Sequence, residues 1–145
     1  MLEYLKRLFE DEAQQQEDEF GAELRAAAIL LIEVCYADFD IQQDELKEAA
    51  SALVSLYGLQ EGKAQDLLAQ TLAEHKEVIS LFTYTKLLNE HLSTEQKETL
   101  LLALWKVAHA DNRVVAHEEH RIRKLAEQLH LPHKLFIQTK LQAEN

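Results

Sequence analysis

Two segments of this chain match each other when one is shifted by 73 residues: residues 30–45, "LLIEVCYADFDIQQDE", and residues 103–118, "ALWKVAHADNRVVAHE". In each copy an apolar segment ends in Ala-Asp, and a β-branched residue and then a Glu follow at the same spacing. A repeated helix–turn–helix unit of this kind predicts two similar helix hairpins related by a pseudo-two-fold axis.

The rest of the chain also predicts helices. Only three Gly and one Pro occur in 145 residues, whereas strand-rich folds need frequent turns. Gly58 is placed to end a helix, Ser93 and Gln96 form a capping-box pattern, and Pro132 is placed to begin the last helix. We therefore expect an all-α bundle of seven to eight helices that contains the two hairpins, as one domain over residues 19–145.

An arm, residues 1–18, precedes this domain. Four of its apolar residues recur at helical spacing, namely Leu2, Leu5, Leu8 and Phe9. The short amphipathic helix that they predict would dock on the domain or, through residues 1–9, make a weak contact with a membrane surface. No apolar stretch approaches the ~18 residues of a transmembrane helix, and no signal-peptide pattern is present. We expect a cytoplasmic protein.

Charge and cysteine content exclude other classes. The formal net charge is −11, and an acidic surface repels phosphate backbones, so we expect no nucleic-acid partner. Cys35 is the only cysteine; no disulfide can form within the chain, and its apolar surroundings predict a core residue.

The repeated corners carry four acids: Asp38, Glu45, Asp111 and Glu118. Each Asp can accept hydrogen bonds from free N–H groups of the next helix, and a Glu in a first turn is favoured by the helix dipole. Alternatively, the axis brings all four carboxylates together, where a divalent cation would neutralise them. One corner alone has too few oxygen ligands for a calcium-binding EF-hand loop. His117 and His120 are secondary candidate ligands, since residues three apart share a helix face.

Three positions exchange an acid for a base between the two copies: Glu33 with Lys106, Asp40 with Arg113 and Glu48 with Arg121. We hypothesise that these charges pair across the axis and fix the register of the two hairpins. An exposed pair contributes only about 0–1 kcal/mol, so the effect would be on specificity more than on stability.

The two corners resemble the signature of the TerB-like tellurite-resistance family, in which an Ala-Asp-Gly-type corner followed by an aliphatic residue and Glu occurs twice. Residues 100–140, "LLLALWKVAHADNRVVAHEEHRIRKLAEQLHLPHKLFIQTK", resemble the C-terminal segment of its small stand-alone bacterial members, and the resemblance spans roughly residues 22–141. It implies an all-helical fold, a metal site at the four corner acids, and a link to tellurite and other stress responses. Phe39 and Asn112 replace the corner Gly.

The expected function is therefore non-enzymatic, with a divalent cation as the candidate ligand. No G-x-S-x-G, P-loop, Gly-rich dinucleotide turn or C-x-x-C pattern occurs, and no catalytic residue is assigned. The alternative is a module for protein interaction or self-association, in which the corner acids only cap helices and an apolar groove binds the partner.

Overall fold

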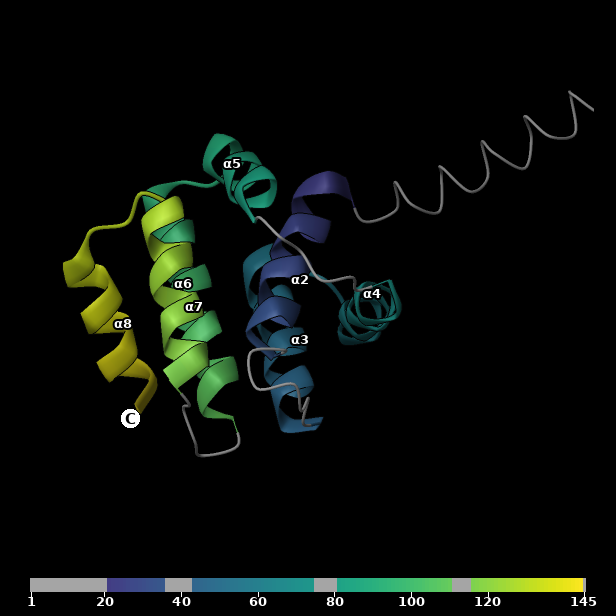
Figure 1. The fold of residues 1–145 in the computed structure, drawn as a ribbon. Helices are drawn as coiled ribbons and strands as arrows, with labels where there is room; N and C mark the ends of the chain where they lie inside the picture. Colours follow the sequence, from purple (N-terminus) through teal and green to yellow (C-terminus); the bar gives the residue numbers. More distant parts are fainter. Residues whose placement is uncertain (1–20, 36–42, 75–80, 111–115, 145) are drawn as a thin grey trace, which may run out of the picture.

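The computed structural model describes residues 21–35, 43–74, 81–110 and 116–144. The elements in these ranges are helices: α2 (Gly21–Cys35), α3 (Gln43–Tyr57), α4 (Glu61–Ala73), α5 (Phe82–His91), α6 (Thr94–His109), α7 (Ala116–Gln128) and α8 (His133–Glu144). The described residues contain no strand, and the all-α prediction is confirmed (Figure 1). The predicted arm, residues 1–18, lies outside the described ranges.

Local sequence signals set several helix ends. The Ser93 hydroxyl accepts a hydrogen bond from the Gln96 backbone N–H at 3.1 Å, and the Gln96 side chain accepts one from the Ser93 N–H at 2.9 Å. This reciprocal capping box begins α6 as predicted. Gly58 follows α3 with a φ of 66°, a left-handed conformation that Gly adopts without the steric penalty of a Cβ. Its N–H donates to the Val54 carbonyl at 2.9 Å.

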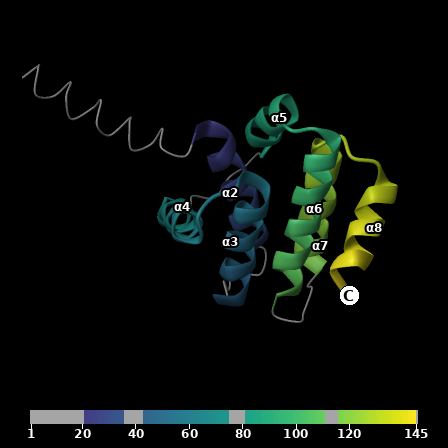
Figure 2. The same ribbon diagram turned by 180° about the vertical axis from the view of Figure 1, so that it is seen from behind.

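The helices form two groups that meet mainly where α2 and α3 contact α6. Helices α2 and α3 make the first hairpin, and α4 packs against both of them. Helices α6 and α7 make the second hairpin, and α8 packs against both of these. Helix α5 contacts α2 and α7 and lies across one end of the bundle (Figures 1 and 2). At the other end α2 stops and α3 starts, and α6 stops and α7 starts. The helix ends that flank the two repeated corners therefore lie at the same end of the molecule.

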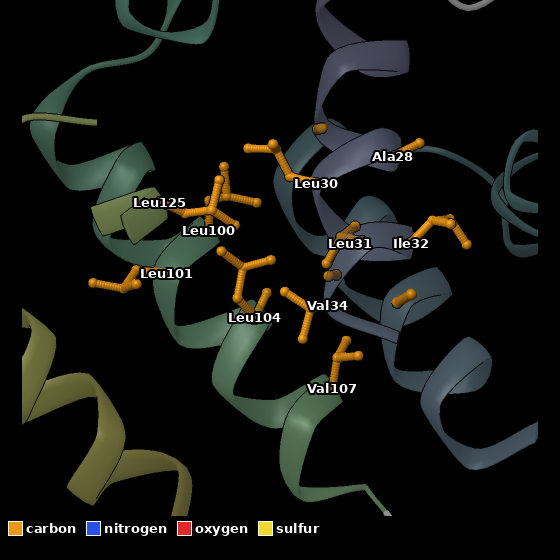
Figure 3. Close-up of a cluster of buried hydrophobic side chains, with 14 of the residues drawn as sticks. Ala28, Leu30, Leu31, Ile32, Val34, Leu100, Leu101, Leu104, Val107 and Leu125 are labelled. Atoms are coloured by element: carbon orange, nitrogen blue, oxygen red, sulfur yellow. The ribbon is translucent and has the colours of Figure 1, made fainter. Parts of the chain in front are cut away.

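The contact between α2 and α6 joins equivalent residues of the two hairpins. Leu31 and Val34 of α2 point toward Leu104 and Val107 of α6 (Figure 3), and each residue is separated from its counterpart by 73 positions. All four are fully buried, and each such burial contributes roughly 1.5–3 kcal/mol. Side chains that meet their own equivalents lie close to a two-fold axis, so this contact marks where the axis runs.

No helix in the described part of the chain is long and apolar enough to cross a membrane. The buried apolar side chains of all seven described helices belong to one hydrophobic cluster that includes Trp105 and Phe136. Cys35 is buried within it, at the end of α2.

Candidate functional site

Two glutamates occupy equivalent positions in the first turns of α3 and α7. Glu45 and Glu118 are each 1% exposed. Glu45 stands one helical turn before the buried Ala49, and Glu118 stands one turn before the buried Ile122. Each carboxylate thus begins the core-facing stripe of its helix, at a position where an amphipathic helix ordinarily carries an apolar residue.

A buried carboxylate is costly unless its charge is compensated. Transfer of an ionised group out of water requires a cation, a hydrogen-bond network or protonation to offset the lost hydration. The helix N-terminus compensates part of the charge of Glu45 and Glu118, and both take part in interactions within the chain. Both equivalent glutamates need their charge compensated, which indicates that the buried glutamate has the same role in each hairpin.

The helix face that carries Glu118 is directed at the opposite hairpin. Arg121 lies three residues further along α7, on the same side of the helix, and its Nη1 donates to Oε2 of Glu33 on α2 at 2.5 Å. The Glu33 side chain is 4% exposed, and that of Arg121 is 39% exposed. Since Arg121 reaches across to α2, the first half of α7 lies beside the last turn of α2.

The corresponding face of α3 is directed at the second hairpin in the same way. Glu48 lies three residues after Glu45, and it lines a hollow of about 120 Å³ together with Lys106 of α6. Helix α3 packs against α6 along this hollow. Glu45 and Glu118 therefore stand in the first turns of two helices that begin at the same end of the bundle (Figure 1).

The described ion pair does not join two residues that are equivalent under the 73-residue shift. The described ion pair of Glu33 is with Arg121, and these two residues come from two different aligned pairs. A two-fold axis that relates Glu33 to Lys106 also relates Arg121 to Glu48, so the equivalent of the observed pair is Lys106 with Glu48. Residues away from the axis meet residues other than their own equivalents. Asp40 and Arg113 lie outside the described residues.

Only one of the other candidate ligands, His120, has a side chain within the described ranges. Asp38, Asp111 and the side chain of His117 lie outside them, and His120 is exposed on α7. Within the described ranges, no three His, Cys, Asp or Glu side chains gather closely enough to hold a metal ion. The described contribution to the site is thus one buried carboxylate from each hairpin, and a complete ligand set would need the corner aspartates.

The contacts that two basic side chains make with an acid and with aromatic rings were not predicted from the sequence. Helix α8 is held against α6 and α7 by Lys140, whose Nζ lies 3.0 Å from Glu119 Oε1 and 5.8 Å from the centre of the Trp105 ring. Arg123 lies over the ring of Phe136 at 5.4 Å. These contacts join residues of three helices. The sequence offers no signal for them beyond helical periodicity.

Comparison with known proteins identifies a family to which the chain is similar. A family model described as "Tellurite resistance protein TerB" matches residues 24–141, a span that runs from the first turn of α2 into α8. No curated protein and no solved structure matches the chain.

Proposed function

This chain belongs to the TerB family of tellurite resistance proteins, and on that premise we propose that it is a non-enzymatic, cytoplasmic domain that binds a divalent cation between its two helix corners. The link to tellurite and other stress responses is supported by the family alone. The cation site is supported by the arrangement of the described carboxylates.

The observation that carries the proposal is the pair of buried glutamates at equivalent positions, Glu45 and Glu118. A cation between the corners would offset the cost of burying both carboxylates at once. Asp38 and Asp111 precede them by the same spacing and would complete a ligand set of four carboxylates. Hard cations such as Ca²⁺, Mg²⁺ and Mn²⁺ prefer oxygen ligands. His117 and His120 would join for a cation that also accepts imidazole nitrogen, such as Zn²⁺.

Binding at this place would connect the two hairpins. Each hairpin would supply one Asp and one Glu, so the site is complete only when α3 and α7 start side by side. A cation that binds this folded arrangement and not the unfolded chain stabilises the fold, by about 2.7 kcal/mol at a concentration of 100 times Kd. Cation concentration would thereby control how firmly the two hairpins are held together.

Isothermal titration calorimetry with Ca²⁺, Mg²⁺, Mn²⁺ and Zn²⁺ tests the proposal. We expect saturable heat with at least one of them, with a stoichiometry near one ion per chain. Glu45→Gln and Glu118→Gln should each abolish or strongly weaken it, because each removes one charged ligand. Asp44→Asn is the matched control, since Asp44 adjoins Glu45 in the first turn of α3 but is exposed. Absence of heat and of any thermal shift with all four cations would contradict the cation site and leave the carboxylates as helix caps.

A further inference from the structure

A groove of about 590 Å³ lies between α3 and α4. Its apolar lining comes from both helices and consists of Leu46, Ala50, Leu68, Ala69 and Leu72. Its polar lining consists of Gln43, Asp44 and Lys47 of α3 and of Glu61 and Gln65 of α4. Asp44 and Glu61 are both exposed and come from opposite walls. The groove is separate from the carboxylates of the corners, because Glu45 and Glu118 do not line it.

We propose that residues 1–9 of this same chain occupy the groove as an amphipathic helix. A groove with an apolar floor and polar walls is the kind of surface that binds one face of a helix. Three features of residues 1–20 favour this occupant: its apolar face, the position of its cations and its length.

The first nine residues separate into two faces when they are placed at 100° per residue. The apolar side chains fall on one side: Met1, Leu2, Tyr4, Leu5, Leu8 and Phe9. Glu3, Lys6 and Arg7 fall on the other side. A helix of this length is marginal alone in water and gains its stability from burying the apolar face. The leucines of the groove supply a surface for that burial.

The charges of the segment complement those of the groove. At helical spacing Lys6 and Arg7 border the apolar face on its two sides, and the groove presents Asp44 and Glu61 on its two walls. The described lining holds two acids and one base, Lys47, so its net charge is negative and favours an arm whose apolar face is bordered by cations. Exposed pairs of this kind contribute little energy but select the orientation of the docked helix.

The connecting chain is long enough. Residues 10–20 comprise 11 residues before α2 begins at Gly21, and fully extended they span roughly 36–40 Å. Helix α2 itself packs against both α3 and α4, so the tether starts on a helix next to the groove. A tether of this kind gives an effective concentration on the order of millimolar, which favours docking within one chain.

A spin label on the arm tests the docking in the full-length chain. Cys35 is buried, so a nitroxide reagent will react with the introduced thiol of Glu10→Cys, on the polar side of the arm. We expect strong paramagnetic broadening of the methyl signals of Leu46 and Leu72. Leu141 on α8 is the control, because it is 55% exposed and α8 lies on the opposite side of the molecule from α4 (Figures 1 and 2).

Variants in the arm and at the exposed Asp44 and Glu61 complete the test without changing the described core residues. Leu5→Asp with Leu8→Asp should remove the broadening at Leu46 and Leu72. Asp44→Lys with Glu61→Lys should weaken it at least two-fold, and the added exchange of Lys6→Glu with Arg7→Glu should restore it. Absence of broadening in the groove of the labelled chain overturns the proposal. So does broadening that appears only between chains, in a mixture of isotope-labelled and spin-labelled protein, since the occupant would then be a second copy.

Discussion

Arg121 of α7 donates a hydrogen bond to Glu33 of α2 across 88 positions of sequence. The pair connects the last turn of one helix of the first hairpin with the first half of a helix of the second hairpin. Because the Glu33 side chain is almost completely buried and Arg121 is partly exposed, the two partners contribute unequally. Loss of the pair should therefore cost more at the buried Glu33 carboxylate, which has little access to water, than at the Arg121 guanidinium, which solvent can hydrate.

Arg121→Ala should therefore lower the free energy of unfolding by about 1–3 kcal/mol, because it removes a charge-assisted hydrogen bond from a buried carboxylate. Urea unfolding followed by circular dichroism measures this change. Lys124→Ala is the control, since Lys124 is exposed on the same helix and should alter stability by less than about 0.5 kcal/mol. In the double variant Glu33→Gln/Arg121→Ala, part of the loss should be recovered. Equal effects of Arg121→Ala and Lys124→Ala would show that the pair does not stabilise the fold.

The effect of neutralising Glu45 or Glu118 should grow with cation concentration. Without divalent cations, Glu118→Gln should change stability by less than about 1 kcal/mol, because the relief of removing a buried charge is offset by the loss of the interactions that this carboxylate makes within the chain. At a saturating concentration of the bound cation, the same variant should be less stable than the unsubstituted protein by about 1–3 kcal/mol, because it lacks one ligand. Thermal unfolding in chelator and in cation gives both values. A variant that is equally destabilised in the two conditions would indicate a capping role instead.

The leucines at the axis should tolerate truncation poorly. Leu104→Ala should cost about 2–5 kcal/mol, because Leu104 is fully buried where α2 and α6 meet and its removal leaves a cavity. Leu141→Ala, at a leucine that is 55% exposed, should cost less than 1 kcal/mol. Chemical denaturation of the two variants provides the comparison. If both losses were small, the contact between α2 and α6 would not be the centre of the core.

The capping box of α6 should have a measurable effect of its own. Ser93→Ala removes the acceptor of the Gln96 N–H and should cost about 1 kcal/mol, within the range of 0.5–2 known for such caps. Ser51→Ala is a suitable comparison because Ser51 is exposed within α3, where Ala is a better helix former than Ser. The midpoint of urea unfolding should fall for Ser93→Ala and stay constant or rise for Ser51→Ala. The opposite order would be inconsistent with this cap.

Alkaline pH should destabilise the fold partly through Tyr57. Burial, and next the carboxylate of Glu23, raise the pKa of the Tyr57 hydroxyl above its ordinary value, which is about 10. The folded state therefore holds this proton more tightly, and the contribution to stability is complete below pH ~10 and decreases as pH rises toward the folded-state pKa. Tyr57→Phe should lose stability less steeply above pH 10 than the unsubstituted chain. Identical pH profiles of the two proteins would exclude this contribution.

Much of the fold was predictable because its signals are local. The scarcity of Gly and Pro, the capping box at Ser93 and Gln96, and the stop at Gly58 act within a few residues, and the structure has helix ends at those places. The repeat predicted the two hairpins, and the family resemblance is confirmed over residues 24–141. The cation at Asp38, Glu45, Asp111 and Glu118 stays a prediction.

The sequence by itself determined which segments are helical and which acids are equivalent, because helical periodicity and an internal repeat are properties of neighbouring and aligned residues. Only the tertiary structure decided that Glu33 pairs with Arg121, that Glu45 and Glu118 are both buried, and that α3 and α4 leave a groove. The physical reason is the axis: residues on it, such as Val34 and Val107, meet their equivalents, whereas residues away from it meet partners that depend on how the hairpins pack.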